Sequence, residues 1–216
     1  MSAPPEIHLL LYRKPEQTAE AFAAAMRAAL PPGATLALAL PDDALPSLAH
    51  AADRSPEVPD ALVLLPDGAD AAALVAASDA SRACTVAAVR HAILLGRDAI
   101  RLFFGLRRLP QLSQPAFHDY WLNRHAMIGR RLIPPYSYHQ LHADSVATDA
   151  ASTATAIPPI DLDGIVEVHF PDIDAFVRQL SRKEVAEEAL EDERNFIDHS
   201  RSFFWAFAED GAEDNV

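Results

Sequence analysis

The first half of the chain alternates short apolar runs with alanine-rich segments. Short apolar runs bounded by turn residues are typical of buried strands. Alanine is the strongest helix former, and Thr18 stands where a helix N-cap is expected. Four prolines between residues 41 and 59 predict a loop or a broken helix. The pattern predicts the order β-α-β-β-α-β, with strands at 7–12, 35–40, 61–65 and 85–95 and helices at 19–30 and 69–80.

The second half repeats this order with longer helices. Ser113 caps a helix that carries Pro115 in its first turn and runs to about residue 132. Asp172 or Asp174 caps another helix that reaches to about residue 196. The Ala/Ser/Thr-rich segment 143–161 has neither helical nor strand periodicity, so we expect a flexible loop there. The predicted strands are 100–106, 136–142, 164–170 and 203–208.

An internal repeat relates the two halves. The run 11–15, followed by Thr18 and Phe22, aligns with the run 106–110, followed by Ser113 and Phe117, at identical spacing. Residues 1–97 and 98–216 are therefore expected to form one β-α-β-β-α-β unit each. A four-stranded sheet with both helices on one face leaves its other face bare, and two such units can cover each other. The expected product is an α+β barrel with pseudo-two-fold symmetry.

Composition and charge exclude several classes of protein. Half of the residues are apolar, yet no apolar run is long enough to span a membrane, and the N-terminus lacks the features of a secretory signal. The single cysteine, Cys84, fits a reducing, cytoplasmic location. A net charge of −13 would repel a nucleic acid. Much of the acidity falls in 184–193 and in the tail 209–214, where we expect solvated side chains and infer no specific partner.

The helix after Ser113 contains the strongest candidate for acid-base chemistry. Phe117, Trp121 and His125 recur every four residues and so share one face of the helix. Phe117 and Trp121 suit a core, and His125 falls where the apolar stripe would continue, at the edge of a cavity. A buried histidine bonded to a backbone carbonyl is the structural alternative.

Strand alternation adds further polar candidates. In 164–170 we place Ile165, Glu167 and His169 on the face between the two sheets. In 136–142 we place His139 and Leu141 on the helix side. The residues predicted to share the inter-sheet space with Glu167 and His169 are Tyr138, Gln140 and His142. Such a set suits proton transfer on a carbonyl compound, and a polar network that fixes the strand register is an equal alternative. An error of one residue would reverse a face.

Metal and cofactor motifs are weak in this sequence. There is no His-Glu-x-x-His run, cysteine pair, glycine-rich nucleotide loop or Gly-x-Ser-x-Gly elbow. A metal site formed by His142, Glu167 and His169 on adjacent strands is geometrically conceivable. We predict neither a metal nor a cofactor.

Four motifs in the second half resemble the EthD-domain family. The first runs from Arg107 to His125, with Pro110, Leu112, Ser113, Phe117, Tyr120 and Trp121 at its fixed positions. The others are Tyr138-x-Gln140, the run 163–170 and Glu193-x-x-Phe196-Ile197-Asp198. The resemblance covers about half of the chain and implies two ferredoxin-like units packed sheet to sheet. The family usually has a Gly-Pro turn after the histidine, whereas Ala126-Met127-Ile128 follows here.

The resemblance implies small-molecule chemistry. The family's helix histidine maps onto His125 and its third-strand acid onto Glu167, and related barrels act as dehydratases, cyclases or isomerases. We therefore expect a cofactor-independent lyase or isomerase in which Glu167 orients His125. Tyr138, His142 and Arg107 would bind the oxyanion, with Gln140, His169 and Trp121 also lining the substrate site. A non-catalytic binding or accessory protein, and a haem or metal accessory, are the alternatives. The predicted partner is a small-molecule substrate, with a homodimer possible and residues 143–161 as a lid.

Overall fold

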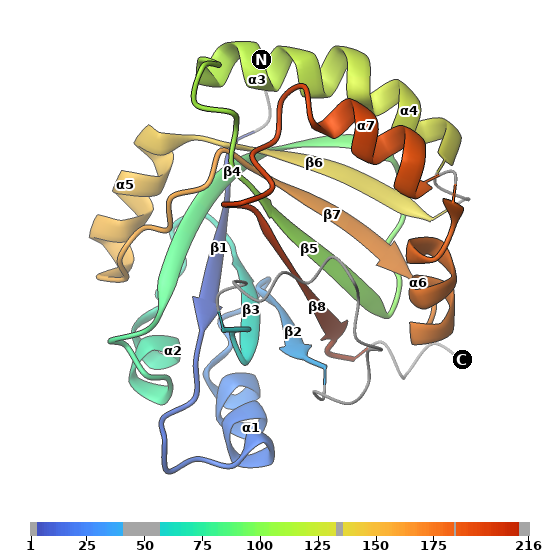
Figure 1. The fold of residues 1–216 in the computed structure, drawn as a ribbon. Helices are drawn as coiled ribbons and strands as arrows, with labels where there is room; N and C mark the ends of the chain where they lie inside the picture. The colour runs from blue at the N-terminus through green and yellow to red at the C-terminus, as the bar shows by residue number, and fades with distance from the viewer. Residues whose placement is uncertain (1–3, 41–56, 133–135, 184, 212–216) are drawn as a thin grey trace.

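Eight antiparallel strands close into a barrel in the computed structural model of the chain (Figure 1). The structure describes residues 4–40, 57–132, 136–183 and 185–211, so most of the loop predicted at 41–59 lies outside the described residues. The strand order around the barrel is β1-β3-β2-β8-β5-β7-β6-β4, and β4 pairs with β1 to close it. The predicted α+β barrel is therefore confirmed.

The elements of the first half match the prediction closely, apart from a shorter second helix. Thr18 caps α1, as predicted, because its side chain accepts a hydrogen bond from the backbone N–H of Ala21. The elements in chain order are β1 (Glu6–Leu11), α1 (Ala19–Ala29), β2 (Thr35–Ala39), β3 (Ala61–Leu65), α2 (Ala72–Ala77) and β4 (Cys84–Leu94).

The second half contains more helical segments than the first in the described residues. Ser113 and Asp172 cap their helices through side-chain oxygens that accept backbone N–H groups. The strands are β5 (Ile100–Leu106), β6 (Ser137–Ala143), β7 (Gly164–Phe170) and β8 (Phe203–Glu209). The helices are α3 (Gln114–Tyr120), α4 (Ala126–Leu132), α5 (Ser145–Thr155), α6 (Ile173–Leu180) and α7 (Leu190–Glu193), with π-helical turns η1 (Trp121–His125) and η2 (Val185–Ala189).

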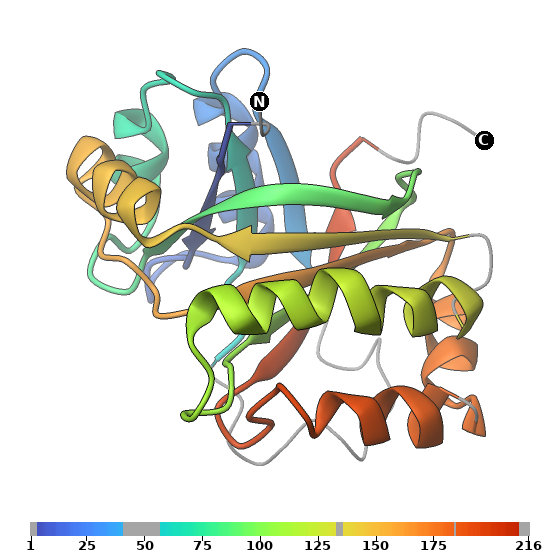
Figure 2. The same ribbon diagram turned by 90° about the horizontal axis from the view of Figure 1, so that it is seen from above.

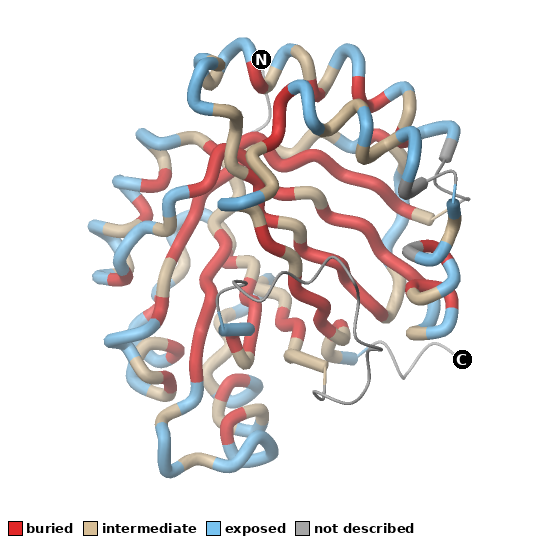
Figure 3. Tube along the Cα trace, in the orientation of Figure 1, coloured by how far each residue is buried: buried red, intermediate tan, exposed pale blue. Residues whose placement is uncertain are grey.

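Each half of the chain contributes four adjacent strands in the same relative order. The first half supplies β4-β1-β3-β2 and the second supplies β8-β5-β7-β6. The two seams are the antiparallel pairs β2–β8 and β4–β6. Figure 3 shows that the strands are largely buried, whereas the helices expose their outer faces to solvent. Each sheet is therefore covered by helices outside and by the other sheet inside.

The segment 143–161 is not the flexible loop that its composition predicted. Asp144 caps α5 by accepting the backbone N–H of Ala147, and Ala156 ends the helix in the left-handed conformation. Alanine-rich sequence has high helix propensity, which outweighed the missing periodicity. The side chain of Thr148 accepts the backbone N–H of Ala87 at 2.9 Å. This segment therefore completes the hydrogen bonding of β4 where β6 no longer pairs with it, and it is not a free lid.

The helix predicted from residue 172 to about residue 196 is interrupted. α6 ends at Leu180, and η2 and α7 form a second helical piece from residue 185 to residue 193. In contrast, α3, η1 and α4 follow one another without a break from residue 114 to residue 132. Figure 2 shows this long helix running beside β6, with α7 alongside it. The π-helical turn η1 places Trp121 and His125 at its two ends.

Apolar side chains fill much of the barrel interior. Phe103, Trp205 and Phe207 pack there against one another, and Leu141 and Ile165 belong to the same cluster. Around these residues the barrel interior is therefore a packed core rather than an open channel. Within the described ranges, no helix combines the length and the apolar character needed to cross a membrane.

Candidate functional site

The two faces of β6 are opposite to those predicted from the sequence. Leu141 lies in the barrel interior with Ile165, its register partner on β7. His139 is the register partner of Glu167 and shares the interior with it. Tyr138, Gln140 and His142 therefore face the helices and not the inter-sheet space. The prediction for β7 holds, since Ile165, Glu167 and His169 all face inward.

The helix-side residues of β6 serve to hold the α3–α4 helix. The side-chain amide of Gln140 donates hydrogen bonds to the carbonyl oxygen of Trp121, at 3.0 Å, and to the hydroxyl of Tyr138, at 2.9 Å. The same carbonyl oxygen accepts the backbone N–H of Ala126 in the π-helical turn. Burial raises the pKa of Tyr138. These contacts make Gln140 and Tyr138 structural supports of the turn that carries His125.

A stack of aromatic rings surrounds His142. The ring centroids of His118 and Trp121 lie 4.3 Å and 5.0 Å from that of His142, and the ring of His91 lies 4.2 Å away. Burial, with smaller contributions from His118 and His91, lowers the pKa of His142 to about 2. His142 is therefore a neutral packing residue, and Trp121 is a fully buried core residue beside it.

His125 forms a histidine–aspartate pair in the helical layer. Its Nδ1 atom lies 2.8 Å from a carboxylate oxygen of Asp192 on α7, and the ring packs against Phe196. The other oxygen of Asp192 accepts the hydroxyl of Tyr120 at 2.8 Å. Asp192, which the sequence did not single out, therefore fixes the orientation of the imidazole and leaves Nε2 free of hydrogen bonds to the described residues.

The predicted partnership between His125 and Glu167 is wrong. Glu167 points into the barrel, where it contacts His139, Arg90 and Arg101, whereas His125 lies outside the sheet. The two side chains therefore do not line one cavity. The physical reason is that His125 projects from a helix that packs on the outer face of the sheet, and Glu167 occupies the opposite face.

Arg107 lies at the end of β5 and is held there by acidic neighbours. Its guanidinium contacts the backbone oxygen and the carboxylate of Asp161, and lies 3.4 Å from the carboxylate of Asp163. Asp163 also pairs with Arg108 at 2.6 Å. The contacts of Arg107 therefore join the end of β5 to the segment before β7, and they include neither His125 nor Glu167.

A buried network of charged and polar groups occupies one end of the barrel interior. Glu167, Arg101 and His169 are nearly inaccessible to solvent, with 1%, 3% and 1% of their surface exposed. Arg101 bridges the carboxylates of Glu167 and Glu209. Arg90 bridges those of Glu167 and Glu6. The remaining members of the network are His8, Ser137 and His139.

The arginines keep the buried carboxylates ionised. Burial alone would raise the pKa of Glu167, but Arg101, His139 and Arg90 hold it well below its usual range. Burial likewise opposes ionisation of Glu209, but His169, Arg101 and Arg97 lower its pKa to about 2. Burial lowers the pKa of His8 to about 4, and neither of its ring nitrogens has a hydrogen bond to the part of the chain that the structure describes. The network is thus ionic at Glu167 and neutral at His8.

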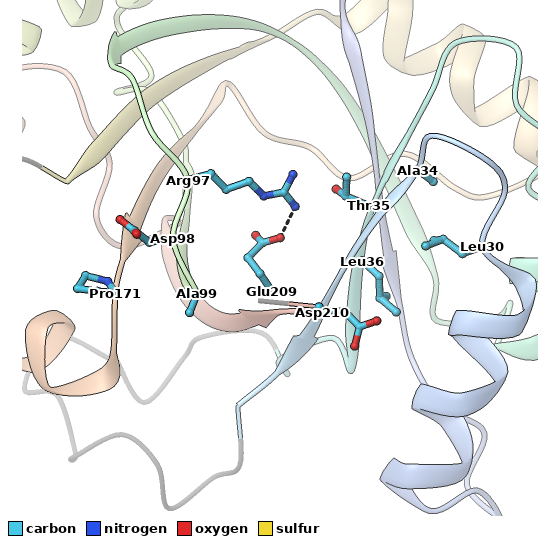
Figure 4. Close-up of a pocket in the computed structure, with 11 residues that line it drawn as sticks. Leu30, Ala34, Thr35, Leu36, Arg97, Asp98, Ala99, Pro171, Glu209 and Asp210 are labelled. Carbon is cyan, nitrogen blue, oxygen red and sulfur yellow. Dashed lines mark hydrogen bonds and ion pairs between the residues drawn. The ribbon is translucent and has the colours of Figure 1, made fainter. Parts of the chain in front are cut away.

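A pocket of about 580 Å³ opens at this end of the barrel (Figure 4). Glu209 and Arg97 line it and form an ion pair, drawn in Figure 4 as a dashed line. Glu209 also contacts the buried Arg101 and lies 3.4 Å from Nε2 of His169. The carboxylate of Glu209 therefore joins the pocket to the internal network. His125 does not line this pocket.

Arg90, Arg101 and Glu209 were not predicted as site residues from the sequence. Arg101 stands inside an otherwise apolar strand, and a charge at such a position signals a buried ionic partner. Arg90 likewise follows a run of buried apolar residues in β4. Glu209 was assigned to a solvated tail, but it ends β8 and is only 8% exposed. The charged residues that point inward from β4, β5 and β8 could therefore have been recognised from the sequence as candidates for a buried ionic network.

The fold and these sites define an antiparallel α+β barrel with buried polar groups from both halves of the chain. The family model of the EthD domain matches residues 109–200, which confirms the resemblance drawn from the sequence motifs. The matched range, residues 109–200, contains His125, Asp192, His139, Glu167 and His169.

The chain is also similar, at a low level, to a solved structure. The chain has a TM-score of 0.48 and 10% identity to a solved structure from Lactobacillus acidophilus NCFM described as a "putative monooxygenase". The match covers 96% of this chain and 95% of that chain. No curated protein matches the chain.

Proposed function

We propose that the chain is a small-molecule lyase or isomerase in which His125 acts as the general acid or base. The hydrogen bond of 2.8 Å between Nδ1 of His125 and Asp192 carries this proposal. A carboxylate on one ring nitrogen sets the tautomer and leaves the other nitrogen to exchange a proton with substrate. The substrate class is a carbonyl compound with an acidic C–H bond next to the carbonyl.

Two further observations support this role for His125. The residue ends a π-helical turn, and such turns occur frequently at functional sites. The EthD domain contains both members of the pair, so the pair lies in the part of the chain that has a family relationship. Asp192 is then a positioning residue, and the hydroxyl of Tyr120 fixes its second oxygen.

The experiment is deuterium exchange at the carbon next to the carbonyl. The purified chain is incubated in heavy water with a panel of β-hydroxy and poly-keto acids, and exchange is followed by proton NMR. Replacing the general base typically lowers such a rate by about 10²–10⁴-fold, and we expect this from His125→Gln. Asp192→Asn should lower the rate less and shift its pH profile. His118→Gln, on the same helix, is the matched control.

Retained exchange in His125→Gln would disprove the assignment to His125. Absence of exchange for every compound, together with measurable binding, would favour the second candidate, a non-catalytic ligand-binding or accessory protein. The packed barrel interior and the separation of His125 from the pocket in Figure 4 support that alternative. The ligand would then occupy the pocket lined by Arg97 and Glu209, and Arg97→Ala would weaken its binding.

We also infer that the chain consists of two ferredoxin-like units, 1–97 and 98–216, related by a pseudo-two-fold axis. The identical relative strand order of the two halves supports this division. The first unit carries Met26 and Leu64 where the second carries Trp121 and Glu167. On this proposal the first unit closes the barrel, and the second carries the acid-base chemistry.

A further inference from the structure

We propose that His139, Glu167 and His169 form a binding site for a divalent transition-metal ion inside the barrel. One nitrogen from each histidine and one carboxylate oxygen lie within 4.8 Å of one another, and all three residues are buried. Two histidines and one carboxylate on a common side suit iron(II), zinc and related ions. Calcium and magnesium, which prefer oxygen ligands, are not favoured.

Strand register brings the three ligands together. His139 and Glu167 are directly opposite each other on β6 and β7, and Ser137 is opposite His169 in the same ladder. Side chains two residues apart on one strand face the same way, so both ligands of β7 point inward. The ligands therefore come from rigid, hydrogen-bonded strands and not from loops.

His139 and Glu167 share a contact with one cationic group, the guanidinium of Arg90. Nδ1 of His139 and a carboxylate oxygen of Glu167 lie 3.1 Å apart, and one nitrogen of Arg90 contacts both. In the tautomer that leaves Nδ1 unprotonated, this nitrogen accepts from the guanidinium, which also donates to the carboxylate of Glu167. The nitrogen and the oxygen thus converge on one positive group, as they would on a metal ion.

Two buried atoms of the ligand set are only weakly partnered. Within the described residues, Nε2 of His169 and the second carboxylate oxygen of Glu167 make no hydrogen bond, and each has a charged neighbour at 3.4 Å, Glu209 and Arg101 respectively. Nδ1 of His169 lies 2.9 Å from the hydroxyl of Ser137. When Nδ1 donates its proton to that hydroxyl, Nε2 keeps a lone pair for a metal in place of its 3.4 Å contact with the carboxylate of Glu209. Such outer contacts orient metal-binding histidines.

The arginines do not prevent metal binding, because each has another carboxylate. Arg90 already holds both oxygens of Glu6 at 2.8–3.0 Å and can leave Glu167 without losing its partner. Arg101 contacts Glu209 more closely than it contacts Glu167, at 3.4 Å. Withdrawal of Arg90 frees the charge of Glu167 for a divalent ion. Arg90 and the metal therefore compete for one position.

The test is cobalt(II) and zinc(II) binding to the full chain after removal of bound metal with a chelator. Cobalt binding is followed by its visible absorption bands, and stoichiometry by equilibrium dialysis. We expect one ion per chain, bound about tenfold or more weakly after His139→Gln or His169→Gln. His142→Gln, on the outer face of the same strand, is the matched control and should keep the wild-type affinity.

A gain-of-affinity variant makes the test independent of folding losses. Arg90→Gln removes the competing guanidinium and should tighten binding about tenfold. Affinity unchanged in Arg90→Gln, His139→Gln and His169→Gln would overturn the proposal, as would absence of binding in both wild type and Arg90→Gln. The measurement needs no substrate, so its outcome does not depend on the role of His125.

Discussion

The inner and outer faces of β6 place histidines in opposite chemical surroundings. His139, on the inner face, lies between Arg90 and the ionised carboxylate of Glu167. His142, on the outer face, is stacked between aromatic and imidazole rings and has a strongly lowered pKa. Two histidines three positions apart on one strand therefore lie in different surroundings. One is in the ionic interior, and the other is in an aromatic contact with the helix. Residue type alone therefore did not show which histidine of this strand enters the barrel.

The largest expected loss of stability comes from removing the carboxylate of Glu167 inside the barrel. Glu167→Ala leaves Arg90 and Arg101 without one of their buried carboxylates, and breaking a buried pair typically costs about 3–5 kcal/mol. The free energy of unfolding, measured in urea, should fall by that amount. Glu187→Ala removes a carboxylate from an exposed pair with Lys183 and should change stability by less than about 0.5 kcal/mol. Equal losses in the two variants would refute an ionic interior.

The buried His142 on the outer face of β6 should make the stability of the protein depend on pH. His142 titrates near 6.5 in the unfolded chain and near 2 in the folded protein, so the unfolded state binds more protons between these values. Stability should therefore decrease as the pH falls below 6.5, by about 2 kcal/mol between pH 7 and pH 5 for this residue. His142→Phe, measured at each pH, should remove that part of the dependence. His8 contributes in the same direction, with a folded-state pKa of about 4.

A parallel pH dependence in wild type and His142→Phe would contradict a neutral, buried His142. The comparison uses slopes and not absolute stabilities, because replacing an imidazole with phenylalanine also changes packing.

The smallest effect concerns the hydrogen bonds between β6 and the helix. Gln140→Met keeps the volume of the side chain and removes its bonds to Trp121 and Tyr138. Neutral hydrogen bonds contribute about 1 kcal/mol each, so we expect a loss of about 1–2 kcal/mol in urea unfolding. A variant as stable as wild type would show that Gln140 does not support the π-helical turn. Cobalt affinity should stay unchanged, since Gln140 faces away from the metal site.

Much of the architecture was predictable from local sequence. The bounds of β3, β5 and β7 agree with the prediction, because short apolar runs between turn residues are a strong signal. The caps at Thr18 and Ser113 were equally clear. The helix α5 was missed because alanine, serine and threonine gave no amphipathic stripe, although its alanines favour a helix.

The candidate sites were only partly predictable. His125 was predicted as a site residue from its position on a helix face, but its partner Asp192 lies on a distant helical piece that sequence spacing could not place beside it. Glu167 and His169 were placed on the correct face of β7. His139 was placed on the wrong face of β6, and Arg90 and Arg101 come from strands whose register with β6 and β7 was unknown.

The sequence by itself determined the alternation of strands and helices, the repeat and the EthD motifs, because these depend on local propensity and spacing. Tertiary structure alone decided which side chains of β6 enter the barrel. All seven residues of β6 are buried, so polar and apolar positions do not mark an outer and an inner face. Pairing with β7 fixed the register, and with a side-chain period of two this choice placed His139, and not His142, beside Glu167.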